Sequence, residues 1–122
     1  MFIKLNHQNL EVYAVSKLLT IECYKFTNQL PAHEKFALIS QIRRAALSIH
    51  LNIAEGSSRS SKIERRRYFE IARGSIIEID AALDIAKELG YFETFQGEIL
   101  GRAILHCFKL ISGMINSIPK SI

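Results

Sequence analysis

The sequence predicts an all-α protein, an up-and-down antiparallel four-helix bundle with a left-handed twist. Apolar residues recur at alternating intervals of three and four positions along most of the chain, which is the spacing of a buried helical stripe and of left-handed bundle seams. Helix-breaking residues divide the stripes into four segments with short connections. No segment alternates with period two for long enough to form a strand.

The first predicted helix covers about residues 9–28 and is apolar on two sides. One stripe begins at Val12, and the second consists of Leu10, Ala14, Leu18 and Ile21. Pro31 cannot lie inside a helix, so it separates this helix from the second, which we expect at about 34–55. One small bundle cannot bury both stripes of the first helix, which predicts self-association.

The third helix is predicted at about 61–89. Gly56 is expected to cap the end of the second helix, and Ser61 with Glu64 forms a capping box that starts the third. Gly90 is expected to end it. Gly74, inside this helix, indicates close approach of another helix, either from this chain or from a second copy.

The fourth helix is predicted at about 95–118, capped by Thr94 and ended by Pro119. Four residues add apolar surface beyond its seam, which again favours an oligomer: Ile99, Ala103, Phe108 and Leu110.

Composition restricts the class of protein. The 122 residues are 48% hydrophobic, which excludes disorder, and residues 1–122 are expected to form a single domain. No uncharged stretch exceeds 10 residues, which is too short to cross a membrane, and no secretory signal is evident. We therefore expect a cytoplasmic protein with reduced core thiols at Cys23 and Cys107.

Motifs for catalysis or metal binding are not found. No Glu has a His three positions later, and no phosphate-binding loop, nucleophile elbow or zinc-protease motif occurs. We therefore predict a protein that is not an enzyme and that has no cofactor and no metal site.

The net charge of +4 is concentrated in one region. Residues 43–73 carry eight Lys and Arg against three Glu, an excess larger than the charge of the whole chain. The third helix is basic at its N-terminal half and acidic at its C-terminal half, opposite to what its dipole favours. A partner outside the helix would compensate these charges. The candidate nucleic-acid-binding residues are Arg43, Arg44, Arg59, Lys62, Arg65, Arg66, Arg67 and Arg73.

Individual roles follow from helical projection. Arg43 and Arg73 lie at one level of adjacent helices and are expected to act as paired phosphate contacts. Arg65 projects toward the core, which is tolerable only at the open end of the bundle. Lys62, Arg66 and Arg67 would extend the basic surface. The alternative is a solvated face in which Arg66 and Arg73 pair with Glu70 and Glu55 pairs with Arg59 or Lys62. Tyr68 either stacks on a base or, as the sequence favours, packs between helices.

Five blocks give the chain a recognisable pattern, in a fixed order and spacing. They are residues 41–49, 52–56, Arg59 with Ser61-Lys62, 71–75 with Glu78, and 86–91. On these residues the chain resembles the four-helix-bundle proteins encoded by bacterial 23S rRNA intervening sequences. That family is similar to the accessory variability determinant of diversity-generating retroelements, a barrel-like homopentamer with a basic surface.

The resemblance implies a homopentamer that binds RNA or DNA, with a reverse transcriptase or another protein as a possible partner and no membrane contact. Together with the basic segment, it leads to the hypothesis of a non-enzymatic, homo-oligomeric accessory protein that binds nucleic acid through the second and third helices. The alternative is a structural or protein-recruiting bundle that does not contact nucleic acid.

Overall fold

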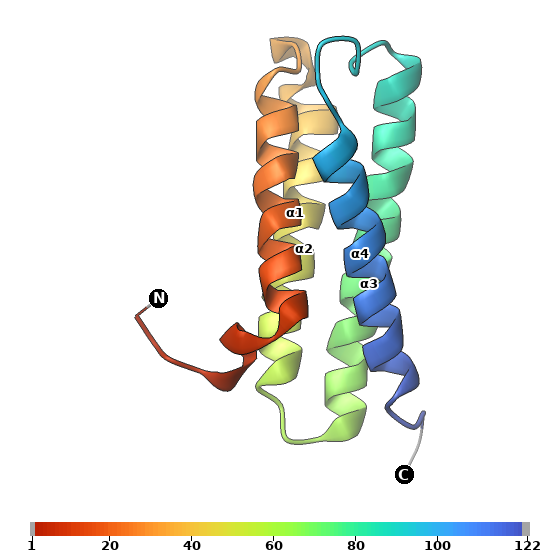
Figure 1. Cartoon of the computed structure of the whole chain (residues 1–122). Coiled ribbons are helices and arrows are strands. Elements are labelled where there is room, and N and C mark those ends of the chain that lie inside the picture. Colours follow the sequence, from red (N-terminus) through yellow and green to blue (C-terminus); the bar gives the residue numbers. More distant parts are fainter. Residues whose placement is uncertain (1, 121–122) are drawn as a thin grey trace.

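The computed structural model describes residues 2–120, and its four long helices run antiparallel in sequence order (Figure 1). They are α1 (Glu11–Asn28), α2 (Ser40–Ser57), α3 (Lys62–Glu88) and α4 (Glu98–Asn116). Three short turns complete the described chain: η1 (Asn6–Asn9), η2 (Ala32–Glu34) and η3 (Lys35–Ile39). The predicted all-α bundle is confirmed, whereas its left-handed twist stays a prediction.

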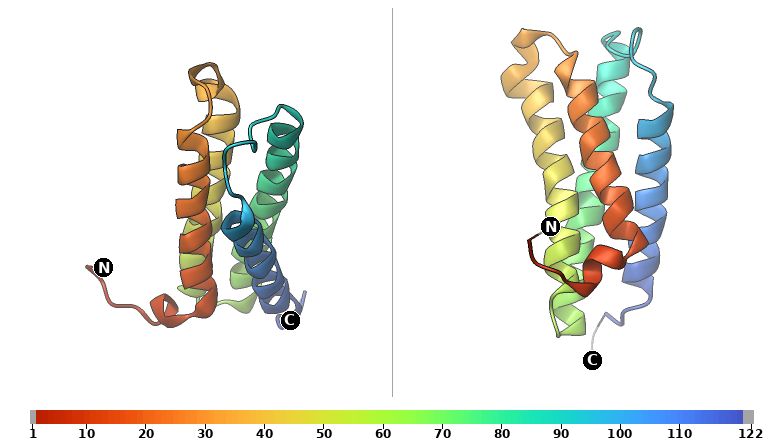
Figure 2. Two further views of the ribbon diagram at one scale, coloured as in Figure 1. Left: turned by 45° about the horizontal axis from the view of Figure 1, so that its top comes forward. Right: turned by 60° about the vertical axis from the view of Figure 1, so that its left-hand side comes forward.

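One core fills the space between the four helices, and each helix supplies large buried side chains to it. Phe26 of α1, Ile49 of α2, Phe69 of α3 and Ile111 of α4 are all fully buried. Helix α1 packs on α2 and α4, and α3 packs on the same two helices, so α1 and α3 are diagonal to each other (Figure 2). The arrangement leaves the outer face of every helix open.

Both thiols belong to this core, as the sequence predicts. Cys23 and Cys107 are free and fully buried. Desolvation by burial raises the pKa of each to about 12, and Glu22 adds to the shift at Cys23. Both thiols are therefore protonated at neutral pH and act as small apolar residues.

The start of the second helix differs from the expected one. Helical backbone is present from Lys35, but η3 is a single turn of π-helix and regular α-helix begins only at Ser40. Apolar spacing detects that a segment is helical but not which hydrogen-bond pattern it adopts. The wider turn leaves Phe36 on the surface, with 88% of its area exposed.

The fourth helix begins at Glu98 rather than at 95, and Thr94 does not cap it. The reason is aromatic packing, because Phe92 and Phe95 fold back onto Phe26, with ring centroids 4.6 and 5.2 Å away. The Thr94 hydroxyl instead donates to the side-chain oxygen of Gln29 at 3.3 Å.

The glycines have different roles from those expected, except at Gly90. That residue adopts a φ of 81° after α3 and ends the helix as predicted. Gly56 is not a cap, since α2 continues to Ser57, and its role is close packing. A Cβ there would lie 2.8 Å from the Cβ of Tyr68 and 3.0 Å from the ring of Phe69. A Cβ at Gly74 would meet nothing within 4 Å, so no helix of this chain approaches it.

Candidate nucleic-acid interface

Five of the eight basic residues gather where α2 ends and α3 begins, at the lower end of the bundle in Figure 1, whereas Arg43 and Arg44 lie near the start of α2 and Arg73 lies further along α3. The expected cap is present there, since Ser61 Oγ accepts the backbone N–H of Glu64 at 3.3 Å. Only part of the predicted set is open to a ligand. The contacts made by each side chain separate the residues that maintain the fold from those that remain accessible.

Arg43 belongs to the first group. Its Nε donates to Thr27 Oγ1 at 2.7 Å and its Nη2 to Asn28 Oδ1 at 2.8 Å. Its guanidinium also lies 4.7 Å from the centre of the Tyr24 ring. All three partners are on α1, so Arg43 fastens α2 to α1.

The expected pairing of Arg43 with Arg73 is therefore wrong. Arg73 lies four residues before Ile77 and seven before Asp80, which places all three on one side of α3. Ile77 and Asp80 line a groove against α4. The two arginines thus share a level but face opposite sides of the bundle, because projection of isolated helices does not show which neighbour a flank meets.

Arg66 also belongs to the fold. Its Nη1 donates to the backbone oxygens of Ile115 at 2.6 Å and Ile118 at 2.5 Å, at the C-terminal end of α4. Only 13% of its side chain is exposed, and its contact with Glu70 is long, at 3.8 Å. A cation that binds the last carbonyls of a helix satisfies acceptors that have no partner within the helix. The prediction that Arg66 extends the accessible basic surface is therefore corrected.

Arg59 forms the ion pair that the alternative interpretation predicted. Its Nη2 lies 2.8 Å from Glu55 Oε1 and 3.1 Å from the hydroxyl of Tyr68. Hydrogen bonding to Tyr68, reinforced by Glu55, raises the pKa of Arg59. Because Tyr68 packs against Gly56 and holds Arg59, it connects the two helices across the turn and is not free to stack on a base.

Five of the eight predicted residues have neither an acidic partner nor a side-chain hydrogen bond within residues 2–120, whereas Arg43, Arg59 and Arg66 are held by other side chains or by the backbone. Three are exposed and two are half-buried. We call them the open cations: Arg44, Lys62, Arg65, Arg67 and Arg73. The pairing of Arg73 with Glu70 that the alternative requires is not formed. Cations thus outnumber acids around the first three turns of α3 and on the outer face of α2, where Glu64 is an exposed acid among them.

Arg65 lies at the open end of the bundle, where the sequence required it to be. Together with Lys62 it lines a cavity of about 210 Å³ that also touches Phe69, Met114 and Ser117. Its Nε is buried without a hydrogen-bond partner in the described part of the chain. A buried donor without a partner is costly, and an anion oxygen would satisfy it.

Other kinds of site were searched for within residues 2–120. This part of the chain contains no group of three or more His, Cys, Asp and Glu positioned to hold a metal ion. None of its helices combines the length and the apolar character needed to cross a membrane. What the open cations offer chemically is electrostatic contact with an anion.

Sequence reasoning located the basic region but not the division within it. The sequence did contain a signal that Arg43 is bound within the chain, since the preceding helix ends with Thr27 and Asn28, whose side chains can accept hydrogen bonds from an arginine. No local signal existed for Arg66, because the carbonyls that it binds are 49 and 52 residues away.

Two comparisons with known proteins complete the description. The model of a family described as "23S rRNA-intervening sequence protein" matches residues 8–113. No curated protein matches the chain.

Proposed function

The chain belongs to the 23S rRNA-intervening sequence protein family, and we propose that it is a cytoplasmic, non-enzymatic, homo-oligomeric accessory protein that binds the phosphate backbone of RNA or DNA. The observation that carries the proposal is the set of open cations, which have no acidic partner in the described chain. Two of them border a cavity in which an arginine Nε has no partner.

The position of the open cations favours phosphate over a protein carboxylate as the ligand. Lys62 and Arg65 lie in the first turn of α3, where backbone N–H groups are free to bind an anion. Arg67 and Arg73 continue the charge along the helix for about 16 Å beyond Lys62, at about 1.5 Å per residue. Charges spread along the helix in this way suit a polymer with repeated phosphates, and such contacts position the polymer without reading its sequence.

Self-association is the second part of the proposal. The predicted surplus stripe on α1 is largely uncovered, with Leu10, Leu18 and Ile21 each more than 40% exposed. Ile99 of α4 is 51% exposed, whereas the chain itself buries Ala103 and half-covers Phe108 and Leu110. Resemblance to the retroelement accessory protein suggests a ring of five, in which several basic patches reach one polymer, and it suggests a reverse transcriptase as a protein partner.

The test is a titration of fluorescently labelled single-stranded RNA and DNA at several salt concentrations. We expect affinity to fall steeply with salt, because phosphate contacts release counterions. The double variant Lys62→Ala/Arg67→Ala removes two exposed cations and is expected to weaken binding to all sequences alike. It should reduce the slope of log affinity against log salt by about two units.

The matched control is Lys17→Ala/Lys25→Ala, which removes the same charge from exposed residues of α1. Since α1 is diagonal to α3, this variant is expected to keep the full salt slope. An equal loss of affinity and of salt slope in both variants would show that binding depends on the net charge of the protein and not on the position of the open cations. Absence of salt-dependent binding at low ionic strength would reject the nucleic-acid part of the proposal.

A further inference from the structure

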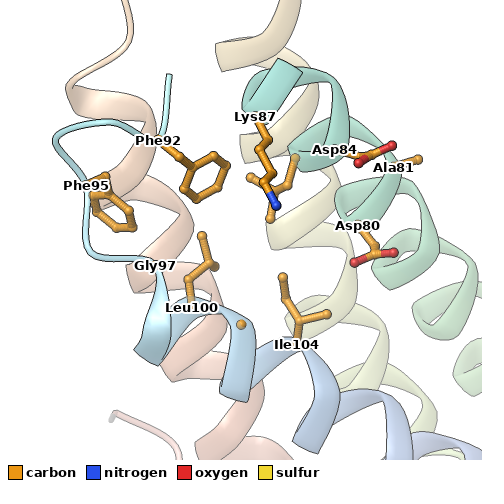
Figure 3. Close-up of a pocket in the computed structure, with 11 residues that line it drawn as sticks. Asp80, Ala81, Asp84, Lys87, Phe92, Phe95, Gly97, Leu100 and Ile104 are labelled. Carbon is orange, nitrogen blue, oxygen red and sulfur yellow. The ribbon is translucent and has the colours of Figure 1, made fainter. Parts of the chain in front are cut away.

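A cavity lies between α3 and α4, at the end of the bundle where α3 ends and α4 begins (Figure 3). It has a volume of about 640 Å³ and an apolar floor built from Phe92, Phe95 and Leu100. We call it the α3–α4 pocket. Its size is within the range of ordinary ligand pockets. Gly101 contributes open space, because a Cβ there would meet nothing within 4 Å.

One wall of the α3–α4 pocket is negatively charged. Asp80 and Asp84 both line it and both are exposed. Neither forms an ion pair within residues 2–120, although Lys87 lies on the same rim. An apolar floor beside two uncompensated carboxylates is complementary to a group that carries an apolar body next to a cation.

The chain itself presents such a group on another side of the bundle. Phe36 is 88% exposed, and the Nζ of the adjacent Lys35 lies 5.4 Å from the centre of its ring. Phe36 and Phe2 are the two exposed phenylalanines among residues 2–120. Phe2 precedes η1, whereas Phe36 is part of η3, at the end of the bundle where α2 begins and where α3 also ends (Figure 1).

We propose that Phe36 of one copy of the chain inserts into the α3–α4 pocket of a second copy, with Lys35 beside Asp80 and Asp84. This inference rests on the self-association in the proposed function and identifies its contact. Phe36 cannot reach the pocket of its own chain, because η3 packs on α1 and α2 while the pocket lies between α3 and α4.

The surfaces on either side of this anchor also match. Leu47 follows Phe36 by about three helical turns on the outer side of α2 and is 40% exposed. The pocket continues along α3 and α4 into a second hollow lined by Ile77, Leu105 and Phe108. Phe36 and Leu47 thus offer two apolar contacts, and the partner surface offers the pocket and the second hollow, with the aromatic anchor at one end.

The contact joins two different surfaces at the same height of the bundle. Such a head-to-tail contact repeats from copy to copy, and it closes into a ring when the rotation permits. Each copy supplies one anchor and one pocket, so the interface can be broken from either side.

The test measures mass by light scattering at micromolar concentration. Phe36→Ala is expected to reduce the mass from several chains to one chain of 13.9 kDa, while helical content is unchanged because Phe36 buries nothing within its own chain. Gly101→Trp fills the pocket and is expected to give the same mass. Phe2→Ala, the matched control at the other exposed phenylalanine, is expected to leave the wild-type mass.

A mixture of the two dissociated variants provides the decisive result. The Phe36→Ala chain retains its pocket and the Gly101→Trp chain retains its anchor, so together they form one contact. We expect a complex of two chains and nothing larger. A wild-type oligomer that Phe36→Ala does not dissociate, or a mixture that remains monomeric, would overturn this inference alone. A wild-type monomer would reject the self-association in the proposed function as well, and the nucleic-acid titration would still stand on its own.

Discussion

Both ends of α3 carry charges of the sign that the helix dipole disfavours, but the two ends differ in how many of these charges have partners within the described chain. At the basic end the structure divides the cations: Arg59 and Arg66 are held by partners within the chain, whereas Lys62 and Arg67 are not. At the acidic end no carboxylate of α3 forms an ion pair within residues 2–120. Glu78 alone is engaged there, by the side-chain amide of Gln41.

This difference shows that a cluster of charge in the sequence can contain two kinds of residue. Those with partners connect helices: Arg59 joins the α2–α3 turn to Tyr68, and Arg66 binds the end of α4. Those without partners serve no evident purpose in the fold and are the candidates for binding. At the acidic end Glu78 is of the first kind, since Gln41 of α2 binds it, whereas Asp80 and Asp84 form no ion pair within residues 2–120 and border an apolar pocket.

The largest expected effect tests how tightly the basic end is packed. Gly56→Ala places a Cβ 2.8 Å from the Cβ of Tyr68, and relief requires α2 and α3 to move apart. We expect a loss of about 1 to 3 kcal/mol in unfolding free energy, as for other overpacked sites, measured by urea denaturation. Gly74→Ala is the matched control, because its Cβ meets nothing and alanine favours the helix by about 1 kcal/mol. A stable Gly56→Ala variant would contradict the packing described here.

The next effect tests the division among the cations directly. Arg66→Ala removes hydrogen bonds from a mostly buried guanidinium to the oxygens of Ile115 and Ile118. We expect a loss of about 1 to 3 kcal/mol, since hydrogen bonds to charged groups are among the stronger ones. Arg67→Ala, one residue along and fully accessible, is expected to change stability by less than about 0.5 kcal/mol. If the two variants were equally stable and only Arg66→Ala lost nucleic-acid binding, their assigned roles would be reversed.

Particular residues show which features of the fold and of the candidate site the sequence could predict. The four helices were predictable because each carries a continuous apolar stripe, and the ends at Ser61 and Gly90 were predictable because their cap chemistry is local. The start of α4 was not, because Phe92 and Phe95 leave the helix to pack on a ring almost 70 residues earlier. The density of basic residues located the candidate interface. It did not show that Arg43 and Arg66 are bound within the chain, because their hydrogen-bond partners lie on or next to other helices and the spacing of residues in the sequence does not reveal such contacts. Phe36 lies in a π-helical turn that periodicity does not detect.

A smaller effect tests whether the reversed charges of α3 have a cost. Lys62→Glu at the N-terminal end and Glu88→Lys at the C-terminal end each align one exposed charge with the dipole. Each is expected to raise the unfolding free energy by about 0.3 to 1 kcal/mol at low ionic strength, and the gain should fall with added salt. Lys62→Glu is also expected to weaken nucleic-acid binding, whereas Glu88→Lys should not. Lower stability in both variants would show that the charges have partners within the chain.

The smallest effect concerns a histidine that lies away from both ends of α3. His50 of α2 meets α1, where its Nδ1 is 2.7 Å from Ser16 Oγ and its ring is 4.5 Å from that of Tyr13. Burial lowers its pKa from the ordinary value of 6.5, and the nearby charges of Lys17 and His7 lower it further. Below pH 6.5 the unfolded chain therefore binds a proton that the folded chain resists. The contribution of neutral His50 to stability is complete at neutral pH and is lost as the pH falls from 6.5 through the lowered pKa. The urea midpoint of the wild type should thus decline between pH 7 and pH 5 more steeply than that of His50→Gln, which cannot take up the proton. Parallel pH profiles for the two proteins would show that the contact between α1 and α2 does not depend on the charge of this ring.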